Sequence, residues 1–151
     1  MNELQPLQAK LDALIAQLSP VKRKQLTRTI GRMLATSQRQ RIARQQNPDG
    51  SAFAPRKPQK NRKGTIKQKA MFRKLRMARL MRTKATADSV EIGYTGANAQ
   101  IAAVHQFGLK SKVNRQASWK IRYEQRELLG FSQQDLEMIE SEILQYLARE
   151  K

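Results

Sequence analysis

Apolar residues in the first third of the chain recur every three or four positions, the spacing of amphipathic helices. The first predicted helix carries Leu4, Leu7, Leu11, Leu14, Ile15 and Leu18. Ser19 and Pro20 suit the cap and first position of a second helix, which extends to about Gln45. Its inward positions are Leu26, Ile30, Met33, Leu34 and Ile42, and its cationic positions are Lys22, Arg23, Lys24, Arg28, Arg32, Arg39, Arg41 and Arg44. The first helix could pack on the second or on a neighbouring subunit.

Alternation of apolar and polar residues predicts strands in the second half of the chain. Leu80 to Ala85 and Val90 to Tyr94 form an expected antiparallel pair, joined by a turn at Ala87-Asp88. Ser118 to Tyr123 alternates again and predicts a third strand. Between Thr65 and about Arg76 the spacing favours a helix instead.

A short buried helix is predicted from about Ala97, because Ile101, Val104 and Phe107 recur at helical spacing. Gly108 suits the position just past its end, where the backbone turns left-handed. His105 is the single histidine of the chain. We expect it to be a partly buried packing residue whose ring nitrogens bond neighbouring backbone.

The last predicted helix begins after Ser132, which Asp135 follows at the spacing of a capping box. Its apolar face consists of Leu136, Ile139, Ile143, Tyr146 and Leu147. Its first half carries Asp135, Glu137, Glu140 and Glu142, where the helix dipole favours acids. This acidic face could be solvated, or it could meet a basic surface of another copy and close a ring head to tail.

Together these patterns predict one α+β domain with N-terminal helices, a small antiparallel sheet with a short buried helix, a long basic loop and a C-terminal amphipathic helix. We divide it into a helical arm (1–46), a basic loop (47–64) and an α+β body that includes the last helix (65–151). Residues 109–118 are a second polar and basic excursion. The 151 residues are 39% apolar and 5% aromatic, enough for a modest core.

The charge is concentrated in one segment of the chain. The net charge is +18, and 21 basic residues against Asp49 give the segment from Lys22 to Lys84 a charge of +20. Such an excess predicts an anionic partner, either nucleic acid or an acidic protein surface. The contact residues we expect in and after the loop are Arg56, Lys57, Lys60, Arg62, Lys63, Lys67 and Lys69. Phe53, the one aromatic residue of the loop, could join this contact.

The sequence offers little for catalysis or for a cofactor. It has no cysteine and one histidine, which argues against disulfides, a metal site and any thiol nucleophile. Phosphate-loop, nucleophile-elbow and zinc-protease motifs do not occur. No stretch reaches the roughly 20 apolar residues of a membrane helix, and the start lacks a signal pattern. We therefore expect a soluble binding or assembly protein without enzyme activity, cofactor or membrane contact.

Three motifs occur in an informative order: Asp49-Gly50-Ser51-Ala52-Phe53-Ala54-Pro55, then Val90-Glu91-Ile92-Gly93 leading to 101–108, then Arg126-Glu127-Leu128-Leu129-Gly130-Phe131-Ser132 before the last helix. This order resembles the phage virion morphogenesis family, the tail completion proteins of contractile-tailed phages. The family's Pro-Ala-Arg-Pro is replaced here by 124–127, which keeps only Arg126. The positions that carry the resemblance are Val90, Ile92, Gly93, Ile101, Val104, His105, Gln106, Phe107, Gly108, Arg126, Leu129 and Gly130.

The resemblance implies a structural virion protein that forms a sixfold ring at the head-proximal end of the tail, in the neck, after assembly in the host cytoplasm. Its implied partners are further copies of itself, tail tube or tail terminator proteins, head completion or connector proteins, and DNA in the lumen. A competing interpretation of the +20 segment is a sequence-independent nucleic-acid-binding protein. A third is a basic scaffold that leaves before maturation.

Overall fold

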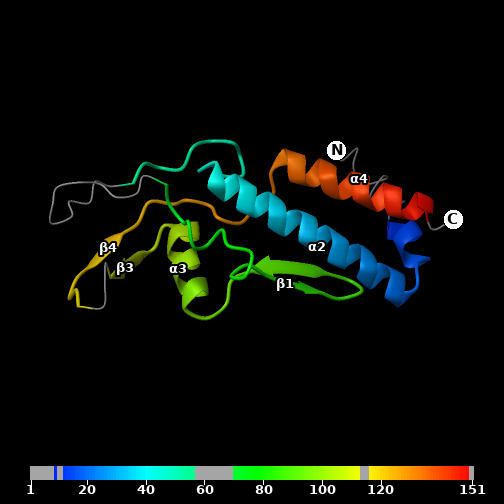
Figure 1. Cartoon of the computed structure of the whole chain (residues 1–151), viewed down its shortest axis with the longest axis horizontal. Helices are drawn as coiled ribbons and strands as arrows, with labels where there is room; N and C mark the ends of the chain where they lie inside the picture. Colours follow the sequence, from blue (N-terminus) through cyan, green and yellow to red (C-terminus); the bar gives the residue numbers. More distant parts are fainter. Residues whose placement is uncertain (1–8, 10–11, 57–69, 113–115, 150–151) are drawn as a thin grey trace.

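The computed structural model describes residues 9, 12–56, 70–112 and 116–149. Within these ranges the fold is α+β, as predicted, with two antiparallel hairpins rather than one sheet. Figure 1 shows α2 and α4 side by side over much of the molecule, with α3 and the second hairpin at the end away from α4. The elements are α2 (Pro20–Ala43), β1 (Arg82–Ala85), β2 (Val90–Gly93), α3 (Gly96–Phe107), β3 (Lys110–Lys112), β4 (Lys120–Arg122) and α4 (Gln133–Arg149).

The long helix α2 begins as its sequence predicts. The hydroxyl of Ser19 accepts the backbone N–H of Lys22 (3.3 Å), and Pro20 occupies the first turn, where no N–H partner is needed. The helix ends at Ala43, two residues before the predicted Gln45, which has a left-handed backbone (φ 57°). Most of the helix predicted before Ser19 lies outside the described residues.

Helix α4 packs along α2 through a cluster that contains Leu26, Ile30, Leu34 and Tyr146. The Tyr146 hydroxyl donates to the carbonyl of Lys22 (3.1 Å), so the aromatic residue also joins the helices by a hydrogen bond. Leu18 packs on this cluster as well, which places the end of the first predicted helix within its own subunit. Leu136 was predicted to face inward but is about half exposed, because the side of α4 that meets α2 passes through Ile139, Ile143 and Tyr146.

The β1–β2 hairpin lies against α2, and its register pairs Arg82 with Gly93 and Ala85 with Val90. Both predicted strands are confirmed to within two residues at each end. The approach is close at Gly31, where a β-carbon would lie 2.6 Å from Thr83 Cγ2 and 2.7 Å from Val90 Cγ2. A larger residue at this position would therefore push the hairpin off the helix.

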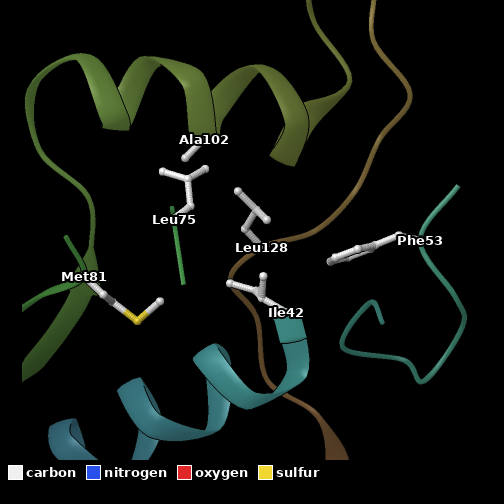
Figure 2. Packing of buried hydrophobic residues seen from close by; sticks show 6 residues of the cluster. All are labelled: Ile42, Phe53, Leu75, Met81, Ala102 and Leu128. Carbon is white, nitrogen blue, oxygen red and sulfur yellow. The ribbon is translucent and has the colours of Figure 1, made fainter. Parts of the chain in front are cut away.

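The second cluster draws one or two side chains from each of several segments, as Figure 2 shows. Its buried members are Ile42, Phe53, Leu75, Met81, Ala102 and Leu128. Phe53 was predicted to be available to a partner, but it is only 6% exposed and meets Phe72 edge to face. Because the aromatic ring of the loop fills the core, the loop start is anchored rather than extended into solvent.

Three further predictions are corrected by the packing. The short helix α3 is not buried as a whole: Ile101 and Phe107 are 50% and 66% exposed, and Ala102 is its buried residue. Residues 70–76 of the helix predicted from Thr65 are turns and bends, and its start lies outside the described residues. The predicted third strand, β4, does not join the β1–β2 sheet. It pairs with β3, a strand within the predicted 109–118 excursion, and the two form a second hairpin.

Candidate partner-binding surface

Residues 126–130, here called the corner segment, join the second hairpin to α4 and are held by side chains from other elements. Gln106 on α3 makes three hydrogen bonds to this backbone. Its Oε1 accepts the N–H groups of Leu128 (2.8 Å) and Leu129 (3.0 Å), and its Nε2 donates to the Leu129 carbonyl (2.8 Å). One side chain thus satisfies backbone groups that no strand partner reaches.

Arg41 binds the corner segment from the α2 side. Its guanidinium donates to the carbonyls of Glu127 (2.9 Å), Leu128 (3.0 Å) and Gln46 (3.1 Å). The sequence interpretation placed Arg41 among the outward cations, yet it is only 3% exposed. Burial lowers its pKa, although the nearby charges of Asp135 and Glu127 oppose that effect. Arg41 is therefore a structural residue and contributes no surface charge.

Gln38 and Asp135 extend this buried network to the start of α4. Gln38 Oε1 accepts hydrogen bonds from Arg41 and from Gly130 N–H (3.1 Å), and its Nε2 donates to Asp135 (3.3 Å). Asp135 also accepts from the Ser37 hydroxyl and the Ser132 N–H. Burial raises the pKa of Asp135, but these hydrogen bonds outweigh it and hold the pKa below its usual value. The predicted capping box is confirmed, because Ser132 Oγ accepts the Asp135 N–H (3.0 Å).

Arg126 connects the corner segment to the start of the basic loop. Its guanidinium donates to the carbonyls of Ala54 (2.8 Å) and Pro55 (3.0 Å). Its backbone N–H donates to the backbone carbonyl of His105 (2.8 Å). Asn47 Oδ1 accepts the N–H of Glu127 (2.9 Å). Two separate contacts therefore fix where the loop leaves the body.

His105 lies between two aromatic rings, with centroid distances of 4.8 Å to Phe72 and 5.1 Å to Tyr123. Its packing role is as predicted, but its Nδ1 is buried and has no hydrogen-bond partner among the described residues. Burial lowers the pKa of His105, and the charge of Arg126 lowers it further. Both effects favour the neutral form of the ring.

A cavity of about 450 Å³ opens beside His105 and is lined by apolar and charged side chains. The apolar lining includes Phe72, Leu75, Ile101, Ile121 and Tyr123, and the charged lining residues are Arg56, Arg73, Lys74, Arg122, Glu124 and Arg126. Five cations against one acid favour an anionic or acidic occupant. Arg56 is thus the one predicted contact residue whose surroundings the structure describes. The others, which lie outside the described residues, are Lys57, Lys60, Arg62, Lys63, Lys67 and Lys69.

The residues that carry the family resemblance fall into two groups in space. His105, Gln106, Arg126, Leu129 and Gly130 gather around the corner segment. Gly108 ends α3 with a left-handed backbone (φ 62°), as predicted. The second group, Val90 and Ile92 with Gly93, forms β2 and packs toward α2 instead. Val104 is half-buried on α3, and Ile101 and Phe107 are exposed.

Sequence reasoning missed Gln38, Arg41 and Asn47, which hold the corner segment from the other side. A signal for two of them exists, because Gln38 and Arg41 continue the inward positions Leu34 and Ile42 at steps of three and four. A polar residue on an inward face needs a buried partner, so this pattern indicates a hydrogen-bonded network. Asn47 lies in a turn sequence and carries no such signal.

The described part of the chain contains no cluster of three or more metal-ligating side chains. Within the same residues, none of the helices is both long and apolar enough to cross a bilayer.

The chain belongs to the phage virion morphogenesis family, whose model matches residues 2–148. The resemblance inferred from the motifs is thereby confirmed. Among curated proteins, the chain is 41% identical over 152 residues to Tail completion protein S of Escherichia phage P2, covering 99% of this chain and 100% of that protein. No solved structure matches.

Proposed function

We propose that this protein is a structural component that completes the tail of a contractile-tailed phage. The observation that carries the proposal is the 41% identity to a protein named for tail completion, which extends over the whole length of both chains. A match of this extent includes the corner segment, the basic loop and both packed helices. We expect no enzyme activity, because tail completion requires binding surfaces rather than bond chemistry.

The assembled form we propose is a ring, sixfold by family resemblance, at the head-proximal end of the tail. Its partners would be tail tube or tail terminator proteins on one side and head completion or connector proteins on the other. Helix α4 supports self-association, because Leu136 and Leu144 are exposed beside Glu137 and Glu140. An apolar and acidic stripe of this kind complements a basic surface on a neighbouring copy. The ring would form in the host cytoplasm and remain in the virion neck.

The basic loop and the cationic side chains that line the cavity are the proposed contacts with these partners. The test reverses four charges at once, with Arg56, Lys57, Arg62 and Lys63 each replaced by Glu. The variant is supplied from a plasmid to a phage that lacks its own copy of the gene. Infectious yield should fall by orders of magnitude, while filled heads and separate tails accumulate in electron micrographs.

The matched control keeps the charge at the same four positions by the exchanges R56K, K57R, R62K and K63R. This control should restore phage yield, which would show that the charge rather than the exact side chain is required. Both purified variants should have the circular dichroism spectrum and melting temperature of the parent, since Arg56 is exposed. Normal yield with the four-glutamate variant would refute the contact role of the loop.

The competing candidate is a sequence-independent nucleic-acid-binding protein, which the +20 segment favours. The mass of the purified protein across a salt series, with and without DNA, separates the two. A closed oligomer that persists at moderate salt without DNA supports the ring. A monomer that becomes large only with DNA, and dissociates as salt rises, supports nucleic-acid binding. Recovery of the protein in purified virions would exclude a scaffold that leaves before maturation.

A further inference from the structure

The β3–β4 hairpin carries a concentrated patch of positive charge outside the basic segment. Its register places Lys110 opposite Arg122 and Lys112 opposite Lys120. Side chains of alternate residues point to the same face of a strand, so these four cations share one face of the ribbon. All four residues are exposed. The middle pair, Ser111 and Ile121, points to the other face.

This arrangement is electrostatically unfavourable within the protein itself. Directly opposed side chains on antiparallel strands have β-carbons about 4.5–5.5 Å apart, and like charges in such pairs destabilise a sheet. The nearest acid in sequence, Glu124, lies beyond the end of β4. In the other hairpin, by contrast, Lys84 is paired with Glu91. The ribbon therefore accumulates repulsion that an external anion would relieve.

The composition of this face identifies the kind of anion. It presents three lysines and an arginine and no apolar side chain, whereas the buried centres of protein interfaces are depleted in lysine. Lysines two residues apart along a strand are separated by about 7 Å, a spacing suited to a row of point charges. A two-stranded ribbon also fits the major groove of duplex DNA. Figure 1 shows the hairpin at the end of the molecule away from α4.

We propose that the cationic face of the β3–β4 ribbon binds the phosphate backbone of duplex DNA without reading its sequence. Lysine ammonium groups supply charge to phosphates and carry little base information. Arg122 donates one N–H to the Gly108 carbonyl (3.3 Å) and retains further donors for a phosphate oxygen. This inference goes beyond the tail-completion proposal and does not depend on it.

The test uses the full-length protein and a fluorescent DNA duplex of mixed sequence, with affinity measured by anisotropy over a salt series. The variant K112E replaces a like-charged cross-strand pair by an opposite-charged pair with Lys120. It should melt at or above the temperature of the parent and yet bind the duplex more than about tenfold more weakly. Because Lys112 is lost and Lys120 is neutralised, the plot of log affinity against log salt concentration should become less steep, and the magnitude of its slope should decrease by about 1.8.

The matched control is R149E, which makes the same change of net charge at an exposed position in the last turn of α4, outside the basic segment. Its affinity should stay within about threefold of the parent, because only the distant field of the protein changes. A neutral variant, K112Q, introduces no new ion pair and should decrease the magnitude of the same slope by about 0.9. Agreement of all three variants with these values supports the proposal.

Three results would overturn it. Equal losses in K112E and R149E would assign binding to overall charge rather than to the ribbon. Unchanged affinity in both K112E and K112Q would remove the ribbon from the contact. A change of oligomeric mass in K112E without DNA would make this face a protein interface.

Discussion

Replacement of Gln106 by Ala tests whether the corner segment is held mainly by side-chain hydrogen bonds. The change removes one acceptor that serves two backbone N–H groups and one donor that serves a carbonyl, at 2.8 Å to 3.0 Å. Leu128, whose N–H loses its partner, has no exposed surface. The groups left behind are therefore shielded from the water that could replace the amide.

The expected cost follows from the number of bonds. A hydrogen bond contributes about 0.5–1.5 kcal/mol net, and a buried group left without a partner costs about 1–3 kcal/mol. Three bonds with partial rehydration at Leu129 give a loss of about 3 kcal/mol in the free energy of unfolding. That is a large fraction of the roughly 5–15 kcal/mol that stabilises a domain. In thermal unfolding it corresponds to a decrease of about 6–12 °C.

The assay is urea unfolding followed by circular dichroism, with Q100A as the matched control. Gln100 is on the same helix, is exposed and is replaced by the same residue, so Q100A should change the free energy of unfolding by less than about 0.5 kcal/mol. Equal slopes against urea in all three proteins would show that the unfolded states are comparable. A Q106A variant as stable as Q100A would refute the assignment of the corner segment to these bonds.

Two further predictions concern residues around the same segment. Burial and the charge of Arg126 lower the pKa of His105, so the stability it contributes is complete above its ordinary value of 6.5 and is lost as the pH falls below that value. The variant H105F should remove this pH dependence in urea titrations. At Gly130 a β-carbon would lie 2.6 Å from Pro48 Cγ, whereas at Gly93 it would meet nothing within 4 Å. G130A should therefore cost about 1–3 kcal/mol, and G93A markedly less, in the same assay.

Elements with local signals could be predicted from the sequence. The cap at Ser19, the box at Ser132 and Asp135, and the left-handed end at Gly108 depend on neighbouring residues, and each is confirmed. The β1–β2 pair is likewise specified by short-range alternation and a turn. The His-Gln-Phe-Gly motif pointed to the family, although its physical role was not evident from the sequence.

Features that depend on distant contacts could not be predicted in this way. Helical spacing placed Phe107 in the core, but the core is filled from elsewhere by Phe53 and Leu128, so Phe107 is exposed. Helical spacing marks Arg41 as an inward position of α2, but the carbonyls that it binds lie more than 80 residues away in sequence and could not be predicted. The second hairpin was missed because β3 has three residues, two of them lysine.

The corner segment contains no proline and is held by hydrogen bonds instead. The N–H of Glu127 donates to Asn47 Oδ1, a bond that a proline at this position could not make. The side chains of Arg41 and Gln106 bind the backbone of this segment, and the side chain of Arg126 joins it to the carbonyl of Ala54. Because this segment joins the β3–β4 ribbon to α4, its hydrogen bonds set the position of the cationic ribbon relative to the acidic helix. A ring that needs both surfaces at once would therefore depend on buried residues that contact no partner.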